Sequence, residues 1–354
     1  MARRPLLQRL DPRSVVVFRA LHLGDMLCAV PALRALRSAL PRAHIALVGL
    51  PWAQQFADRF PRYIDEFIPF PGHPLLPGQP VDHDALAAFY AGVCARRFAL
   101  AIQLHGSGDV GNDIVSAFGA AVMAGFRRGA ARTREREVLL AYPETGSEPE
   151  RLLAFMAQLG ADVGGDLAGA HLEFPLTRLD EDELAASGIG QDLAPGEYFC
   201  IHPGARRRDT CWPAALFAEV GDRIAAEFGL RPVLTGSDAE AELTAEVASR
   251  MHRKPVDAAA PISIGAMAVL LRGARLLLCN DTGVSHIAAG LKLKSVVIFS
   301  KADIARRAPL DRLTHRCIWD PAAERASMVL QHARALLSGT APSRQRCVGM
   351  WPYW

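Results

Sequence analysis

Residues 277–286 read Leu277-Leu278-Cys279-Asn280-Asp281-Thr282-Gly283-Val284-Ser285-His286. The apolar start predicts a buried strand, and the polar turn that follows predicts a helix beginning near Thr282. Asp281 and Thr282 place a carboxylate, a hydroxyl and backbone donors at the positive end of that helix, where a diphosphate would be favoured. His286 shares one helix face with Thr282. A capped helix with a buried, satisfied histidine is the structural alternative.

The same order of strand, polar turn and helix recurs along the chain. It predicts an α/β protein with two Rossmann-like, doubly wound parallel-sheet domains. We expect strands at residues 15–18, 45–48, 66–68, 100–104, 198–201, 232–234, 276–279 and 295–299. We expect helices at residues 24–40, 84–97, 148–159, 213–228, 239–251, 264–272, 282–291 and 322–337.

The length of 354 residues exceeds what one hydrophobic core usually supports. Residues 162–195 are rich in Gly, Asp and Pro and predict the linker. We therefore expect an N-terminal domain over residues 1–185, a second domain over 186–335 and a tail over 336–354. Ligands would bind in a cleft between the domains, at the carboxyl ends of the strands.

The composition restricts the class of protein. Half of the residues are hydrophobic and 22% are charged, which is typical of a globular chain, and the net charge of +3 gives no reason to expect nucleic acid. The seven cysteines form no C-x-x-C pair, so we expect free thiols in a reducing cytoplasm and no zinc site. Neither a signal peptide nor a membrane-spanning stretch is evident, which predicts a cytoplasmic protein with at most peripheral contact with the inner membrane.

The turn after the first expected strand reads Arg19-Ala20-Leu21-His22-Leu23-Gly24-Asp25. Gly24 allows a ligand to approach the backbone. Asp25 can be a helix N-cap, which accepts backbone N–H bonds, or a general base toward a hydroxyl group. The turn alone leaves both interpretations open.

Two turns of the second half carry similar signals. Residues 201–208, Ile201-His202-Pro203-Gly204-Ala205-Arg206-Arg207-Arg208, combine a glycine turn with three arginines, as a phosphate cradle would or as a solvated loop would. Residues 234–240, Leu234-Thr235-Gly236-Ser237-Asp238-Ala239-Glu240, end a strand with an acid that could hold ribose or could serve only the helix start.

Two other strings resemble functional motifs but have a simpler interpretation. Residues 106–111 spell G-x-G-x-x-G, yet they lie in a late βα unit with no acid at the required spacing, so we interpret them as a turn, with Gly106 on a possible acceptor side. Asp180-Glu181-Asp182 spells D-x-D where a helix begins, and acids favour the positive helix end.

Taken together, these stretches resemble glycosyltransferase family 9, the heptosyltransferase-like enzymes, from about residue 14 to 335. The resemblance is carried by Leu23-Gly24-Asp25, Leu104-His105-Gly106, His202-Pro203-Gly204-Ala205, Trp212-Pro213, Thr235-Gly236 and Asn280-Asp281-Thr282-Gly283 with His286. It implies a GT-B fold, two Rossmann-like domains facing a cleft, and inverting, metal-independent transfer. The donor would be a nucleotide sugar, often ADP-heptose, and the acceptor a glycan or glycolipid of lipopolysaccharide core synthesis or another cell-surface glycan.

The resemblance also implies roles for individual residues. Asp25 matches the family's catalytic acid and would act as the base, with no metal and no cofactor apart from the donor. On the donor side we place Gly24, His202, Gly204, Arg206, Arg208, Thr235, Gly236, Glu240, Asp281, Thr282, Gly283 and His286. On the acceptor side we place His22, His105 and Gly106.

One position departs from the family's pattern. Relatives carry Lys or Arg just before Trp-Pro, whereas this chain has Thr210 and Cys211 there. Arg206, Arg207 or Arg208 could supply the charge. A nucleotide-sugar epimerase of the same architecture and a non-catalytic nucleotide-sugar-binding protein are the alternative functions.

Overall fold

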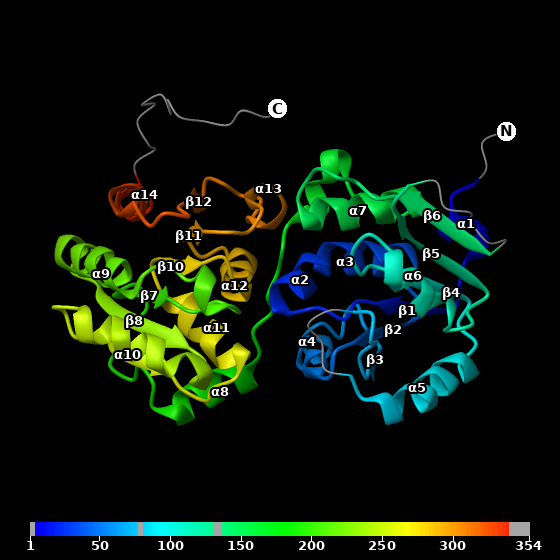
Figure 1. Cartoon of the computed structure of the whole chain (residues 1–354), viewed down its shortest axis with the longest axis horizontal. Coiled ribbons are helices and arrows are strands. Elements are labelled where there is room, and N and C mark those ends of the chain that lie inside the picture. Colours follow the sequence, from blue (N-terminus) through cyan, green and yellow to red (C-terminus); the bar gives the residue numbers. More distant parts are fainter. Residues whose placement is uncertain (1–3, 77–80, 130–135, 340–354) are drawn as a thin grey trace. The chain divides into compact units, whose positions relative to one another are not determined.

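The chain folds into two units, Met1–Pro175 and Leu176–Trp354, shown in Figure 1. The computed structural model describes residues 4–76, 81–129 and 136–339. Within these residues, each unit contains one six-stranded sheet in which every pairing is parallel.

The first sheet has the strand order β3-β2-β1-β4-β5-β6. Its strands are β1 (Ser14–Phe18), β2 (His44–Gly49), β3 (Glu66–Pro69), β4 (Leu100–Gln103), β5 (Val122–Arg127) and β6 (Glu137–Ala141). The helices of this unit are α1 (Leu6–Leu10), α2 (Leu23–Cys28), α3 (Val30–Ala39), α4 (Gln54–Arg59), α5 (His83–Ala95), α6 (Asp109–Ser116) and α7 (Glu148–Leu159), with 3-10 turns η1 (Pro51–Ala53) and η2 (Gly165–Ala170).

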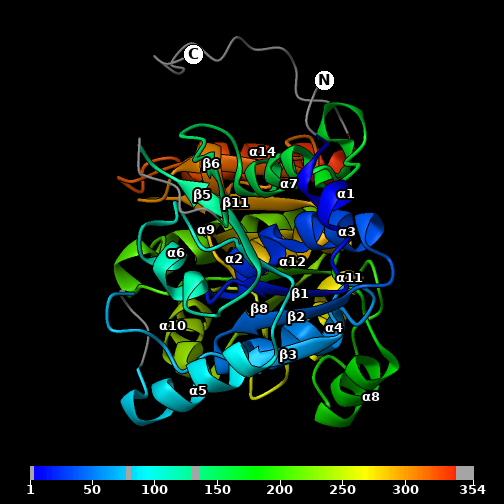
Figure 2. The same ribbon diagram turned by 90° about the vertical axis from the view of Figure 1, so that its right-hand side faces the viewer.

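Strand β1 is the centre of this unit and is apolar on both faces. Val16 and Phe18 pack in one core cluster with Val93 of α5 and Ile114 of α6. Helices α3 and α7 pack against each other, and Figure 2 shows them on the other side of the strands from α5 and α6. Since helices cover both faces, the strand reads as a continuous apolar run rather than an alternating one.

The second sheet has the order β12-β11-β10-β7-β8-β9, which repeats the topology of the first. Its strands are β7 (Tyr198–His202), β8 (Arg231–Gly236), β9 (Val256–Ala259), β10 (Leu277–Asn280), β11 (Ser295–Phe299) and β12 (His315–Trp319). Its helices are α8 (Arg178–Ser187), α9 (Ala214–Phe228), α10 (Ala241–Arg250), α11 (Ile264–Gly273), α12 (Gly283–Leu291), α13 (Ile304–Arg307) and α14 (Ala326–Ser338), with η3 (Arg208–Thr210) and η4 (Asp238–Glu240). Helices α9, α10 and α14 pack in one core cluster with alternate residues of the strands.

The expected strands and helices are present, apart from one helix that is divided in two, and further elements occur that were not expected. The helix expected over 24–40 is two helices, α2 and α3, because Pro31 stands in the first turn of α3 and cannot donate the backbone bond that a continuous helix needs. Strands β5, β6, β9 and β12 and helices α1, α4, α6 and α13 were not expected. Strand β9 reads Val256-Asp257-Ala258-Ala259, so Val256 is its only β-branched residue. Residues 340–354, which include most of the expected tail, lie outside the described residues.

The division between the units falls between Pro175 and Leu176, before α8, rather than after residue 185. Helix α8 packs on α11, where the Glu183 carboxylate accepts bonds from the backbone N and hydroxyl of Ser263 at 2.7 and 2.5 Å. The D-x-D string lies at the start of α8. Asp180 is buried and accepts a bond from the Thr177 backbone N at 2.8 Å, so it caps the helix as its alternative interpretation predicted.

The glycines of the G-x-G-x-x-G string are explained by local packing. Gly108 has φ +96°, and a Cβ there would lie 2.0 Å from the carbonyl oxygen of Phe126 on the neighbouring strand β5. Gly106 has φ +66° but open space around its Cβ position. Residues 106–108 of the string therefore belong to the turn between β4 and α6, and residues 109–111 form the first turn of α6.

These two glycines give a matched test of the packing. We expect Gly108→Ala to destabilise the fold by about 3 kcal/mol or more, because the cost of a positive φ and the cost of a backbone clash add together. Gly106→Ala should cost only about 1 kcal/mol, because it meets the positive φ alone. Urea denaturation of both variants would measure the difference, and equal midpoints would contradict the packing seen around Gly108.

Candidate functional site

In the first unit, the candidate residues gather where the strand order reverses. Strands β1 and β4 are neighbours, although β2 and β3 separate them along the chain, and the segments after both strands meet at the carboxyl edge. The segment after β1 carries His22, Gly24 and Asp25, and the segment after β4 carries His105 and Gly106. Such a reversal is where open parallel sheets bind ligands.

Asp25 lies in the first turn of α2 and is half-buried. The N-cap position belongs to His22, and no side-chain cap bond is made there. Among the described residues, Asp25 accepts a hydrogen bond through its backbone carbonyl and not through its carboxylate, so Asp25 is not the N-cap that one interpretation predicted. The carboxylate is thus available for other chemistry.

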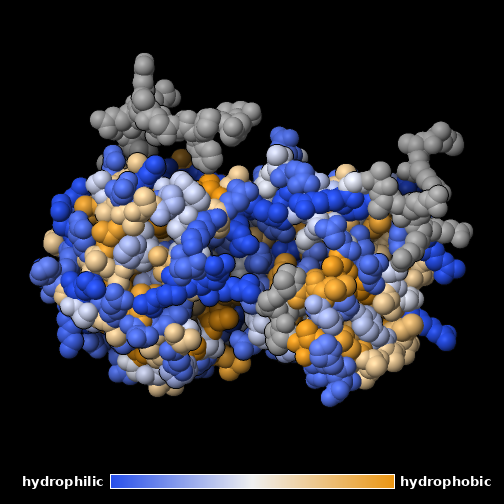
Figure 3. Space-filling view, viewed as in Figure 1, coloured by the Kyte–Doolittle hydropathy of each residue, from blue (hydrophilic) through white to orange (hydrophobic). Residues whose placement is uncertain are grey.

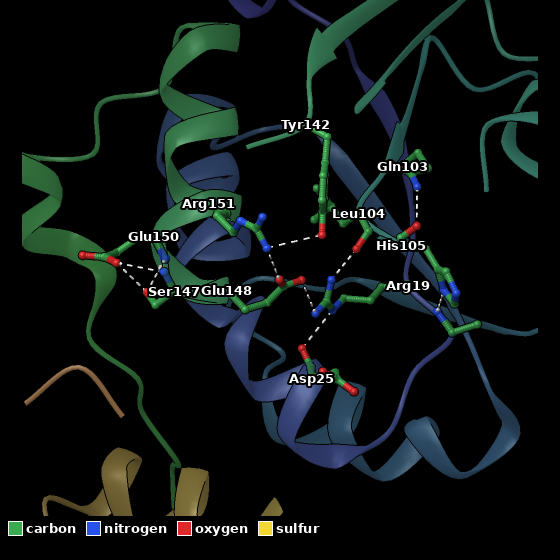
Figure 4. A network of polar contacts seen from close by, with 11 residues as sticks. Arg19, Asp25, Gln103, Leu104, His105, Tyr142, Ser147, Glu148, Glu150 and Arg151 are labelled. Carbon is green, nitrogen blue, oxygen red and sulfur yellow. Dashed lines mark hydrogen bonds and ion pairs between the residues drawn. The ribbon is translucent and has the colours of Figure 1, made fainter. Parts of the chain in front are cut away.

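Arg19 holds the segments of this site together, and Figure 4 shows it at the centre of the network. The side chain is fully buried. Its Nε donates to the Asp25 carbonyl at 2.9 Å, Nη1 donates to the Leu104 carbonyl, and Nη2 pairs with Glu148 at 3.3 Å. One guanidinium therefore ties the segment after β1 to the segment after β4 and to α7.

The Glu148 carboxylate is shared with a second arginine of α7. Arg151 Nη1 lies 3.7 Å from Glu148 Oε2 and donates to the Tyr142 hydroxyl at 3.3 Å. Its guanidinium also lies 4.6 Å from the centre of the Tyr142 ring. Because a buried charge is costly when unpaired, this network makes the position of Arg19 specific.

His105 lies on the opposite side of the reversal from Asp25. Its ring stacks on Phe18 with centroids 5.3 Å apart, and its Nδ1 accepts a bond from the Ala20 backbone N at 3.3 Å. Burial and the neighbouring Arg19 charge lower its pKa to about 4, against the opposite effect of Asp25 and Glu148. The imidazole is therefore neutral near pH 7.

In the second unit, the equivalent reversal lies between β7 and β10, and Asn280 joins its two sides. The Asn280 side chain is buried at the end of β10. Its Oδ1 accepts from the backbone N of Trp212 at 2.9 Å, and its Nδ2 donates to the carbonyl of Pro203 at 2.6 Å. The loop after β7 and the start of α9 are thereby held to β10.

His202, Thr235 and Glu240 meet beside this point. His202 Nδ1 lies 3.1 Å from the Thr235 hydroxyl, which is fully buried, and His202 Nε2 lies 3.9 Å from Glu240 Oε1. Burial lowers the pKa of His202, whereas the Glu240 carboxylate acts in the opposite direction. A Cβ on Gly204 would lie 1.7 Å from Glu240 Oε1, so any other residue there would displace this carboxylate.

Glu240 also shows the local role that the sequence left open. Its Oε2 accepts bonds from the backbone N and the hydroxyl of Ser237 at 2.8 and 2.9 Å. It therefore serves the start of η4 with one oxygen and faces Gly204 and His202 with the other. Gly236 packs against the Glu240 Cβ as well.

Helix α12 begins at the carboxyl end of β10. Thr282 is its N-cap but makes no side-chain cap bond, and Asp281, Thr282 and Gly283 are half-buried at the helix start. His286 lies one turn further and is 7% exposed. The helix start thus combines backbone donors with a hydroxyl that is not used as a cap.

The arginine loop, residues 206–208, contains exposed side chains. Arg207 pairs with Asp209 at 2.8 Å, and Arg208 pairs with Glu246 at 3.1 Å. The Arg207 and Lys301 bonds lower the pKa of Asp209 to about 2. Arg206 is exposed as well.

The fold brings Lys301 to the same loop, which the sequence did not suggest. Lys301 Nζ lies 2.6 Å from Asp209 Oδ2, and the neighbouring Ser300 hydroxyl donates to the Thr210 carbonyl at 2.8 Å. A cation from the end of β11 therefore lies beside the position before Trp212 that lacks one. Its place two residues after an apolar strand was the signal that could have identified it.

Arg19 and Asn280 were also missed as functional residues. Each is a polar side chain at the end of an otherwise apolar strand, and that pattern would have identified both. Within residues 4–76, 81–129 and 136–339, no group of three or more His, Cys, Asp or Glu side chains could hold a metal ion. No helix in these ranges is both long and apolar enough to cross a membrane.

The lowered pKa of His105 predicts a pH effect on stability. The unfolded chain takes up a proton below about pH 6.5, whereas the folded chain resists it until about pH 4. Stability is therefore fully present above pH 6.5 and falls by about 1.4 kcal/mol per pH unit as the pH decreases toward 4. His105→Asn, which keeps an acceptor for Ala20, should lose less melting temperature between pH 7.5 and pH 5 than the unmodified chain. The exposed His44→Asn serves as the control, and an equal loss in all three proteins would contradict the assignment.

Comparison with known proteins gives one curated relative at 31% identity. It is lipopolysaccharide heptosyltransferase 3 of Escherichia coli, aligned over 124 residues that make up 34% of this chain and 35% of the relative. The chain thus spans about a third of the length of the curated relatives that it matches.

Solved structures match over nearly the whole chain. A glycosyltransferase family 9 protein from Veillonella parvula DSM 2008 has a TM-score of 0.79 at 20% identity and covers 92% of this chain and 98% of its own. E. coli heptosyltransferase WaaC with ADP-2-deoxy-2-fluoro heptose has a TM-score of 0.67 at 20% identity and covers 93% and 100%. These likenesses confirm the expected fold class, GT-B with two Rossmann-like domains.

A family model described as "Glycosyltransferase family 9 (heptosyltransferase)" matches residues 87–332 of this chain. The match includes His105 and every candidate of the second unit, but not Asp25. It spans more than half of the chain. The chain therefore belongs to glycosyltransferase family 9.

Proposed function

We propose that the chain is an inverting glycosyltransferase that moves a sugar from a nucleotide-sugar donor to a hydroxyl group of a glycan or glycolipid acceptor. The observation that carries this proposal is that both sheets place polar candidate residues where their strand order reverses. The names of the relatives, a lipopolysaccharide heptosyltransferase and a heptosyltransferase bound to an ADP-heptose analogue, favour ADP-heptose as donor. The first of these names also favours lipopolysaccharide synthesis as the setting. Within this proposal we place the reaction in the cytoplasm, with at most peripheral contact with the inner membrane.

The second unit supplies the donor site. The start of α12 presents backbone donors and the Thr282 hydroxyl, and its partial positive charge favours a diphosphate. His286, Arg206, Arg208 and Lys301 would add to this charge. The diphosphate leaves as an anion, and in this proposal these groups stabilise it without a metal cofactor.

The first unit supplies the base. The Asp25 carboxylate accepts the proton of the acceptor hydroxyl, whose oxygen attacks the anomeric carbon on the face opposite the diphosphate. A new C–O bond forms as the bond to the diphosphate breaks, and its electron pair leaves with the diphosphate. The configuration inverts because the displacement takes place in one step. Arg19 positions Asp25 through its backbone carbonyl.

The donor site can be tested by thermal stabilisation. We expect ADP to raise the melting temperature more than UDP, GDP or CDP, and ADP-heptose to raise it further, because the sugar adds contacts. Asp281→Ala should abolish the shift, whereas Asp303→Ala, at the start of α13, should retain it. Absence of a shift with every nucleotide would contradict the donor site.

The base can be tested by transfer rate. Asp25→Asn should lower kcat by about 10²- to 10⁴-fold, since the amide cannot take up the proton. The ADP shift should remain, because Asp25 lies outside the donor unit. The exposed Asp58→Asn is the matched control. Full activity of Asp25→Asn would refute the assignment, and consumption of donor without acceptor would indicate an epimerase instead.

A further inference from the structure

The first unit contains an apolar pocket of about 690 Å³ that the proposed reaction does not use. Its walls come from the ends of β2 and β3, the segment that follows β3, and α5. Six of the lining residues illustrate its character: Leu50, Ile68, Phe70, Ala88, Phe89 and Val93. Its volume lies within the range of small-molecule sites, roughly 300–1,000 Å³.

The charged groups of this lining already have partners. Asp82 caps α5, and its Oδ1 accepts bonds from the backbone N of Asp84 and of Ala85, both at 3.1 Å. Arg96 donates to Glu66. A charged ligand would therefore compete with the bonds that Asp82 and Arg96 already make. An apolar ligand would instead displace water from the apolar walls of the pocket.

Helix α5 carries apolar residues where a surface helix usually carries charge. Of its thirteen residues only Val93 is buried. The pocket-lining positions Ala85, Ala88, Phe89, Gly92 and Val93 recur at helical spacing and so form one face. Figure 3 shows apolar residues gathered over the part of the first unit where Figure 1 places α5.

The pocket lies at the same sheet edge as Asp25. Leu50 follows β2, and Phe70 follows β3, so both lie at the carboxyl edge that also carries the segment after β1. Strand β3 is two strands from β1, which is roughly 10 Å at the usual spacing.

Aromatic rings connect the two places. Phe89 of the pocket contacts Phe70 at 5.4 Å, Phe70 contacts Phe18 at 5.1 Å, and Phe18 stacks on His105. The wall of the pocket is thus continuous with the packing beneath the Asp25 site.

We propose that this pocket binds an alkyl chain of the acceptor, so that the chain is held beside β3 while the hydroxyl group reaches Asp25. The inference rests on the proposed transfer reaction, and it specifies the acceptor as an amphiphile. The pocket supplies affinity by burying methylene groups and takes no part in the bond changes.

Binding of alkyl β-glucosides tests this inference without any transfer reaction. Titration calorimetry of the full chain with hexyl, octyl and decyl glucoside, each below its micelle concentration, should show affinity rising roughly fourfold per methylene. Methyl glucoside should not bind measurably. No dependence on chain length would overturn the inference.

Gly92 offers a variant that fills the pocket without straining the fold. A Cβ at Gly92 meets nothing within 4 Å, and replacing a helical glycine favours the helix. Gly92→Leu should weaken decyl glucoside binding about tenfold or more, because its side chain occupies the pocket. Ala87→Leu, on the same helix but outside the lining, should change it less than twofold. Equal binding by both variants would place the chain elsewhere and refute the pocket.

Decanoate distinguishes the source of the chain. It carries a chain of similar length on a carboxylate, so equal affinity for decanoate and decyl glucoside would indicate a site for free fatty acid or lipid and would overturn the acceptor assignment. Preference for the glucoside supports it. The two proposals can fail separately. If binding depends on chain length but Asp25→Asn leaves the transfer rate unchanged, the pocket is retained and only the proposed function is rejected.

Discussion

The reversal of strand order is the constraint on which the rest of the structure depends. In each sheet the first strand of the unit lies between its second and fourth strands. Connections to the two sides of that strand then lie on opposite faces of the sheet. Right-handed crossovers impose this arrangement, and the carboxyl edge is left open where the connections diverge. The segments at that opening are the ones that carry Asp25 and His105 in one unit and His202 and Asp281 in the other.

Two buried side chains convert that opening into a defined geometry. Arg19 binds the carbonyls of Asp25 and Leu104, which follow different strands. Asn280 binds Pro203, which follows β7, and Trp212, which precedes α9. Loops at a sheet edge have few backbone partners of their own, and a buried polar side chain that satisfies several of them holds the loops in one arrangement. The two units thus use the same device at the same topological position.

The sequence by itself determined the class of fold and the location of the candidate residues within it. Apolar runs such as 277–279 and 295–299 predicted buried parallel strands because both faces of such strands are covered. Polar turns after them predicted where ligand-facing groups would lie, because strand ends share one edge. Strands β6, β9 and β12 escaped prediction because they lie at the sheet margins, where burial is incomplete and the apolar pattern weakens. Strand β5 is buried over residues 123–126, but Gly125 interrupts its apolar run.

Only the tertiary structure decided how side chains distant in sequence combine. Glu148 reaches Arg19 across 129 residues of chain, and Lys301 reaches Asp209 across 92. Such pairings are set by helix packing and by strand order, and local patterns contain neither. The same holds for the pocket beside α5, since its walls come from segments whose adjacency depends on β2 and β3 being neighbours in the sheet. Periodicity and turn chemistry act over a few residues, whereas contacts of this kind depend on the whole chain having folded.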